Sequence, residues 1–132
     1  MTLFQECVEA LGPNIIILTV EETTDYLEEL CTYYPITSWG RIDWDKISNR
    51  RTIIEKDDLN DWFNENNIST LDVTILWNYT ESPGIKTNLH DALQVLDHVT
   101  AVGSDTFMYN LEVGYVIEFY HEGEVTIGFN KC

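Results

Sequence analysis

The sequence predicts an α+β fold in which a mixed or mainly antiparallel sheet of five or six strands packs against three or four helices and ends in a C-terminal β-meander. Helical and strand-like hydrophobic periods alternate along the chain, which favours mixed architecture. The last third holds short runs of alternating polarity around a turn. With 132 residues, of which 44% are hydrophobic, the chain fits a single domain over residues 1–132.

The N-terminal part is predicted to hold two helices and a strand. Thr2 and Gln5 form a capping-box pattern, and Gly12 is suited to end the helix that they begin. Residues 14–20 are apolar on both faces and rich in β-branched side chains, so we predict a central, well-buried strand. A second helix is expected from Glu21 onwards. Its apolar stripe comprises Tyr26, Leu27, Leu30, Cys31 and Tyr34.

The middle of the chain has weaker patterns. Residues 36–44 are predicted to be extended, residues 44–49 to form a helical turn, and residues 51–55 to form a strand. A short helix is expected next, with Asp57 or Asp58 as its N-terminal cap. The residues of this helix that should face inward are Leu59, Trp62 and Phe63.

A further strand and helix are predicted after residue 70. Residues 71–78 alternate in polarity, as a strand does. Residues 82–84 are typical of a turn, and Asn88 is suited to cap the helix that follows it. The inward residues of the strand are Val73, Ile75 and Trp77, and those of the helix are Leu89, Ala92, Leu93 and Leu96.

The last third is predicted to be antiparallel. Residues 106–110 form one expected strand, and residues 115–120 pair with residues 124–129 around a short loop whose Gly123 suits a left-handed backbone. This register gives the hairpin an inward and an outward face. The inward pairs are Tyr115 with Phe129, Ile117 with Ile127 and Phe119 with Val125, and the outward residues are Val116, Glu118, Tyr120, Glu124 and Thr126.

The charge of the chain is strongly unbalanced. There are 23 acidic and 7 basic residues, which give a formal net charge of −16 at pH 7. Residues 1–40 contain no Lys or Arg, and most of the cations lie in residues 41–56. Such a surface repels nucleic acid and anionic membranes, and it favours fast association with a basic protein. The alternative is that the acidity only confers solubility.

The sequence lacks the motifs of common catalytic and cofactor sites. It has no nucleophile elbow of the G-x-S-x-G kind, and its glycines form neither a dinucleotide-binding nor a phosphate-binding loop. The histidines His90, His98 and His121 do not have the spacing of a zinc site. We therefore expect no catalytic residues, no cofactor and no metal, and a protein that is not an enzyme.

The expected compartment is the cytoplasm. The first residues lack the basic and apolar regions of a secretory signal, and no apolar run approaches the length that crosses a bilayer. Three cysteines without a paired spacing suit a reducing compartment. Cys7 and Cys31 fall on helical apolar stripes, where we expect both to be core residues.

Protein binding is the function class that remains, and carboxylates beside aromatic side chains are its candidate contacts. Such groups anchor Arg or Lys side chains of a partner. Three patches of this kind are predicted. They are the acidic helix with Asp57, Asp58, Asp61 and Glu65, the segment with Asp43, Trp44 and Asp45, and the outward hairpin face with Glu118, Tyr120, Glu122 and Glu124.

The C-terminal segments also carry a family resemblance. Residues 105–110 (DTFMYN) and 114–129 (GYVIEFYHEGEVTIGF) are similar to the end of bacterial immunity proteins of polymorphic toxin and contact-dependent growth inhibition systems. The resemblance implies that residues 1–132 form a domain that binds a cognate toxin domain, often a cationic nuclease, and neutralises it by stoichiometric inhibition. A nuclease presents positive charge to phosphates, so the net charge of the chain agrees with this expectation.

Two other function classes are left open by the sequence. One is a generic acidic regulatory module that binds an endogenous protein partner. The other is a small enzyme that uses carboxylates as acid and base, which requires a concave pocket and carboxylates with perturbed pKa values.

Overall fold

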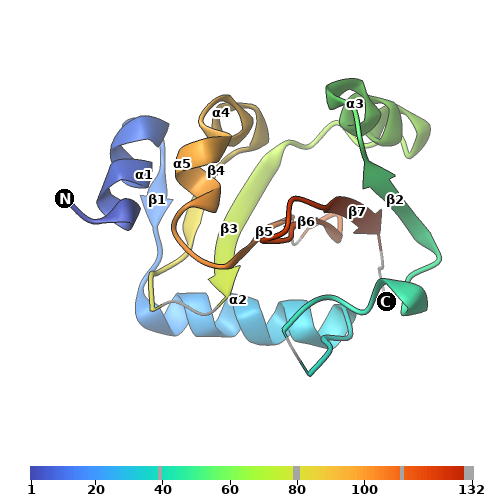
Figure 1. Ribbon diagram of the computed structural model, residues 1–132, viewed down its shortest axis with the longest axis horizontal. Helices are drawn as coiled ribbons and strands as arrows, with labels where there is room; N and C mark the ends of the chain where they lie inside the picture. Colours follow the sequence, from blue (N-terminus) through green and yellow to red (C-terminus); the bar gives the residue numbers. More distant parts are fainter. Residues whose placement is uncertain (39, 79–80, 111, 130–132) are drawn as a thin grey trace.

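A seven-stranded antiparallel sheet is the centre of the structure (Figure 1), a computed structural model that describes residues 1–38, 40–78, 81–110 and 112–129. The strand order is β1-β4-β3-β5-β6-β7-β2, and every neighbouring pair in it is antiparallel. The strands are β1 (Ile16–Ile17), β2 (Asn49–Ile53), β3 (Asp72–Asn78), β4 (Ile85–Asn88), β5 (Asp105–Tyr109), β6 (Tyr115–Phe119) and β7 (Val125–Phe129).

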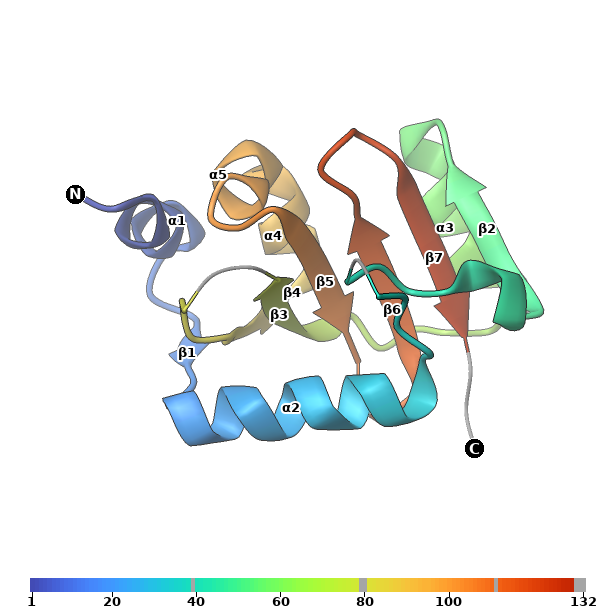
Figure 2. The ribbon, with the colours of Figure 1, turned by 60° about the horizontal axis from the view of Figure 1, so that its bottom comes forward.

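Helices cover both faces of this sheet. One long helix, α2, crosses one face, whereas the shorter helices lie on the other face (Figures 1 and 2). The helices of the described residues are α1 (Leu3–Leu11), α2 (Val20–Tyr33), α3 (Lys56–Glu65), α4 (Leu89–Gln94) and α5 (Leu96–Thr100), with a 3₁₀ turn, η1 (Trp44–Lys46). None of these helices is both long and apolar enough to cross a membrane. The predicted α+β class and the C-terminal meander of β5, β6 and β7 are confirmed, with more strands and helices than expected.

The sheet separates two hydrophobic clusters. On the first face, Trp62 of α3 and Val99 of α5 pack against Ile75 and Ile117 of the sheet. On the second face, Leu30 of α2 packs with the turn at residues 42–47 against other side chains of the same strands. Because successive side chains of a strand point to opposite faces, the central strands are buried on both sides. This is visible in β3, whose Ile75 and Leu76 are both fully buried in different clusters.

Several local predictions are confirmed. Thr2 and Gln5 form the capping box of α1, and α1 is capped by Gly12 at its other end. The hairpin has the predicted register, with Tyr115 opposite Phe129 and Ile117 opposite Ile127. In α3, the three residues predicted to face inward are buried, which are Leu59, Trp62 and Phe63.

The predicted central strand over residues 14–20 is wrong. Only Ile16 and Ile17 form a strand, and this strand lies at the edge of the sheet with its side chains 61% and 47% exposed. Thr19 and Glu22 form a second capping box, so α2 begins at Val20. Two reciprocal hydrogen bonds at a helix start outweigh the β propensity of a short apolar run.

The predicted outward face of the hairpin is also wrong in part. Val116, Glu118 and Thr126 are buried, because α2 and the side chains of residues 42–47 cover the face that we expected to meet solvent. Conversely, Cys31 of α2 is exposed, whereas Cys7 is buried as predicted. Strand β4 was not predicted, and the helix predicted after Asn88 is divided into α4 and α5 at Val95.

Gly128 tests how tightly the second cluster is packed. A methyl group at this position would overlap the indole ring of Trp44 and lie 3.3 Å from the backbone oxygen of Asn49. We expect Gly128→Ala to lower the free energy of unfolding by about 1–3 kcal/mol, as overpacking of a core does. Urea denaturation measures this change. In a double-mutant cycle with Trp44→Phe, the combined loss should be smaller than the sum of the single losses, and simple additivity would contradict this packing.

Candidate functional site

A buried carboxylate joins the segment before η1 to the C-terminal hairpin. Glu118 of β6 is 0% exposed and accepts three hydrogen bonds, from Arg41 Nε at 2.9 Å, from the backbone N–H of Ile42 at 2.8 Å and from Trp44 Nε1 at 3.0 Å. A buried charge is tolerated only where it is paired and hydrogen-bonded in this way. These contacts therefore fix residues 41–44 against the sheet.

The guanidinium of Arg41 extends this cluster to the surface. Its Nη2 donates to Glu124 at 2.7 Å, and its central carbon lies 4.3 Å from the ring centroid of Tyr120. One arginine thus engages two carboxylates and an aromatic face at once. Glu118, Tyr120 and Glu124, which we predicted as partner contacts, all contact Arg41 of the same chain.

Two of the three predicted patches lie together in the structure. Residues 43–45 and the hairpin line one small hollow of about 300 Å³, to which Arg41 and Glu124 also contribute. Trp44 is buried, Asp43 is half-buried with a carboxylate oxygen 3.7 Å from Lys46 Nζ, and Asp45 is exposed. Glu122 is exposed in the hairpin loop. Of these two patches, the side chains exposed to solvent are Asp45, Glu122 and Glu124.

The third predicted patch lies on α3, on the other face of the sheet (Figure 1). Asp57 and Asp61 are exposed, and Glu65 is exposed and paired with Arg51. The carboxylate of Asp58 instead accepts hydrogen bonds from the backbone N–H groups of Glu55 and Ile54, both at 2.9 Å. These bonds lower the pKa of Asp58. They make it the third residue of a capping box whose N-cap is Glu55, so the predicted N-cap at Asp57 or Asp58 is wrong.

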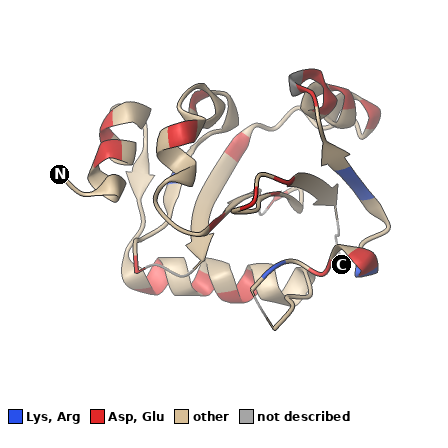
Figure 3. Ribbon diagram, viewed as in Figure 1, with Lys and Arg blue, Asp and Glu red and all other residues tan. Residues whose placement is uncertain are grey.

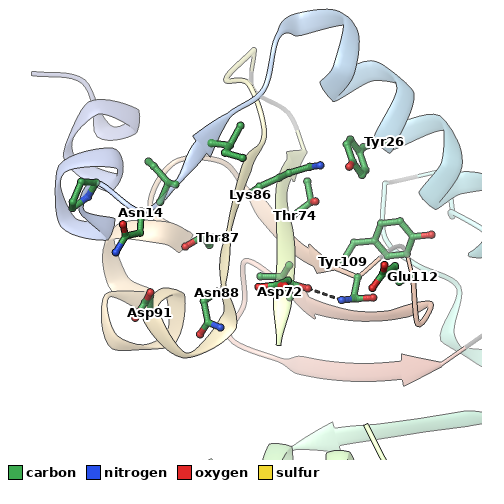
Figure 4. Close-up of a pocket in the computed structure, with 15 residues that line it drawn as sticks. Asn14, Tyr26, Asp72, Thr74, Lys86, Thr87, Asn88, Asp91, Tyr109 and Glu112 are labelled. Atoms are coloured by element: carbon green, nitrogen blue, oxygen red, sulfur yellow. Dashed lines mark hydrogen bonds between the residues drawn. The ribbon is translucent and has the colours of Figure 1, made fainter. Parts of the chain in front are cut away.

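A larger hollow, which we call the β4-edge groove, was missed by the sequence reasoning. It has a volume of about 810 Å³ and is bounded by the loop after α1, by α2 and α4, and by strands β1, β3, β4 and β5. Figure 4 shows its polar side chains, which include the exposed carboxylates of Asp72, Asp91 and Glu112. These carboxylates are far apart in sequence, and β4, which joins them, was not predicted. No local pattern could therefore have identified the groove.

The described residues hold no metal-binding cluster, and the thiol of Cys7 is buried. Among the described residues, no group of three or more His, Cys, Asp or Glu side chains is arranged to hold a metal ion. Burial raises the pKa of the Cys7 thiol to about 11, which keeps it protonated and a poor nucleophile at neutral pH. Cys7 is a core residue of α1.

The stability of the Glu118 cluster can be tested by substitution. In Glu118→Gln, an amide N–H₂ group replaces one of the carboxylate oxygens that accept hydrogen bonds from Arg41, Ile42 and Trp44. This group is itself a donor, so it cannot accept those hydrogen bonds. We expect the free energy of unfolding to fall by about 3 kcal/mol, as when one partner of a buried ion pair is removed. Urea denaturation is the measurement. As a control, the exposed Glu122→Gln should change stability by no more than about 0.5 kcal/mol, and equal effects of the two would refute the role of Glu118.

The chain matches a known protein family over most of its length. A model of the family described as CdiI immunity protein, EcoliA0-like, matches residues 1–128. The match includes both hollows and all of the sheet except the last residue of β7. Among curated proteins, none matches the chain.

Proposed function

Because the chain belongs to the CdiI immunity protein family, we propose that it forms a one-to-one complex with a cationic toxin domain. Membership of this family makes it a toxin-neutralising immunity protein of contact-dependent growth inhibition. A nuclease domain is the kind of toxin that fits best, since it must present positive charge to phosphates. In this proposal the protein works in the cytoplasm, as a binding inhibitor and not as an enzyme.

The observation that carries this proposal is that most of the few basic side chains make their contacts with carboxylates and backbone oxygens of the same chain. Arg41 binds Glu118 and Glu124, Arg51 pairs with Glu65, and Lys46 lies beside Asp43. Arg50 donates to the backbone oxygens of Trp44 and Ile47, at 2.7 and 2.6 Å. The rest of the described surface therefore carries many carboxylates without a basic partner. The formal net charge of −16 thus gives the protein a negative surface potential that a basic partner can meet.

Helix α2 illustrates this outward charge. Its residues Glu21, Asp25 and Glu28 are exposed, and within the described ranges no ion pair involves them. Figure 3 shows acidic residues along α1, α2 and α3, while most of the basic residues that it colours gather at β2 and the segment before it. Such a field accelerates encounter with a basic protein and weakens as salt shortens its range to about 8 Å at physiological ionic strength.

The exposed members of the predicted patches belong to this field. Asp45 and Glu122 lie near the hairpin, and Asp57 and Asp61 lie on α3 across the sheet, whereas the exposed Glu124 is paired with Arg41. Charges at the rim of an interface mainly change the rate of association, whereas buried contacts change the rate of dissociation. We propose that these residues steer the toxin towards the complex.

Calorimetric titration tests the complex. The purified chain is titrated with the toxin domain encoded immediately upstream of it, at about 50 and 500 mM salt. We expect one-to-one binding in the nanomolar range, about −12 kcal/mol, that weakens with salt. Absence of heat together with absence of co-elution would refute the proposed function.

The steering role of α3 can be tested by stopped-flow kinetics. The double substitution Asp57→Asn with Asp61→Asn removes two exposed charges and keeps the size of the side chains. We expect the association rate constant at low salt to fall about two- to fivefold with an unchanged dissociation rate, because the lost interaction acts before contact. The difference should vanish at high salt. A change in the dissociation rate alone would instead place α3 in the centre of the interface.

A further inference from the structure

We infer that the β4-edge groove receives an arginine side chain of the bound toxin, on the side where Thr87, Asp91 and Asn14 line it. This inference rests on the proposed function and names the contact surface that the function requires. Three independent features of the groove lead to it. Within the described part of the chain, they are a buried hydroxyl group without a hydrogen-bond partner, hydrogen-bond acceptors on one side of β4 that pair with no basic side chain, and an exposed apolar border.

The first feature is the hydroxyl group of Thr87. This side chain is 7% exposed, and its Oγ1 has no hydrogen-bond partner among the described residues. Buried polar groups without a partner cost free energy, and they are rare in folded proteins. Thr87 lines the groove, and Figure 4 shows its oxygen directed towards the side of Asn14 and Asp91. A ligand that donates a hydrogen bond there would satisfy it.

The second feature is the separation of charges by β4. Thr87 lies opposite Val73, a residue of the first hydrophobic cluster, while its neighbour Lys86 points to the other face of the strand. The Lys86 ammonium lies 5.3 Å from the ring centroid of Tyr26 on α2. The Asp91 carboxylate lies on the side of β4 that carries Thr87, whereas the Lys86 ammonium lies on the opposite side (Figure 4). Asp91 is exposed and, within the described residues, makes no ion pair.

The chemistry of these groups selects arginine. A carboxylate, a side-chain amide oxygen and a hydroxyl can all accept hydrogen bonds, and a guanidinium offers five N–H donors with no acceptor. Its delocalised charge is weakly hydrated and pairs well with carboxylates in partly closed sites. Arginine is also the charged residue most often found at the energetic centre of protein interfaces.

The third feature is the apolar border formed by β1. Ile16 lines the groove, and Ile16, Ile17 and Val20 are exposed by 61%, 47% and 73%. Strand β1 pairs only with Ile85 and Lys86 of β4, so no β1 residue lies opposite Thr87. Apolar side chains beside uncompensated carboxylates are the composition of an interface with an apolar centre and a polar rim. A toxin surface that seats an arginine in the groove would cover these isoleucines.

The substitution Thr87→Val tests the inference with little risk to folding. It keeps the shape of the side chain and removes a hydroxyl that forms no hydrogen bond in the free protein, so stability should be unchanged or higher. We expect its affinity for the cognate toxin domain in calorimetry to fall about tenfold or more, since hydrogen bonds to charged groups are among the strong ones. The matched control is Thr106→Val, which removes another buried hydroxyl without a partner, outside the groove. Its affinity should not change.

Asp91→Asn provides a second, independent measurement. We expect a loss of about tenfold or more that persists at 500 mM salt and appears in the dissociation rate, because a seated ion pair is only weakly screened. The control Asp97→Asn removes an exposed charge of α5 that does not line the groove, and it should change only the association rate. If the wild type binds but Thr87→Val and Asp91→Asn both stay within twofold, the inference is refuted and the proposed function stands. If the wild type itself does not bind, the proposed function fails.

Discussion

The second face of the sheet depends on one buried carboxylate. Glu118 accepts hydrogen bonds from a side chain and a backbone group of residues 41–42 and from the indole of Trp44. These bonds supplement the apolar contacts that Ile42, Trp44 and Ile47 make in the second cluster. The segment between α2 and β2 closes the second cluster and brings Trp44 against Gly128. An acidic chain thus uses one of its many carboxylates to order its own core, because the donors needed to satisfy it come from the neighbouring segment.

Short sequence patterns predicted the local structure correctly wherever one physical cause dominated. The register of the C-terminal hairpin followed from alternation and from Gly123, whose φ of 100° is adopted readily only by glycine. The helix α1 followed from its capping box and terminal glycine. The fold class followed from the order of such segments. The amino acids of the last third carried the family resemblance, which the match over residues 1–128 confirms, and that resemblance indicated an immunity function.

Long-range packing explains the errors. Whether Ile16 and Ile17 lie in the centre or at the edge depends on which strand pairs with them, and a short apolar run carries no such information. Glu118 has the position of an outward residue in its hairpin, but α2 and residues 41–44 turn that outward face into core. The β4-edge groove unites residues from the loop after α1, from α2 and α4 and from four strands, so it exists only once the sheet is assembled.

The two edges of the sheet differ in a way that bears on self-association. A free edge strand can pair with the same strand of another copy, and short or charged edges prevent this. Strand β1 has only two residues, and β2 at the opposite edge carries Arg50 and Arg51. Two copies joined through β2 would bring their arginines together, and two copies joined through β1 would gain few backbone hydrogen bonds. Both edges therefore oppose strand-mediated polymers, so high concentrations of this immunity protein should leave its toxin-binding surfaces free of such contacts.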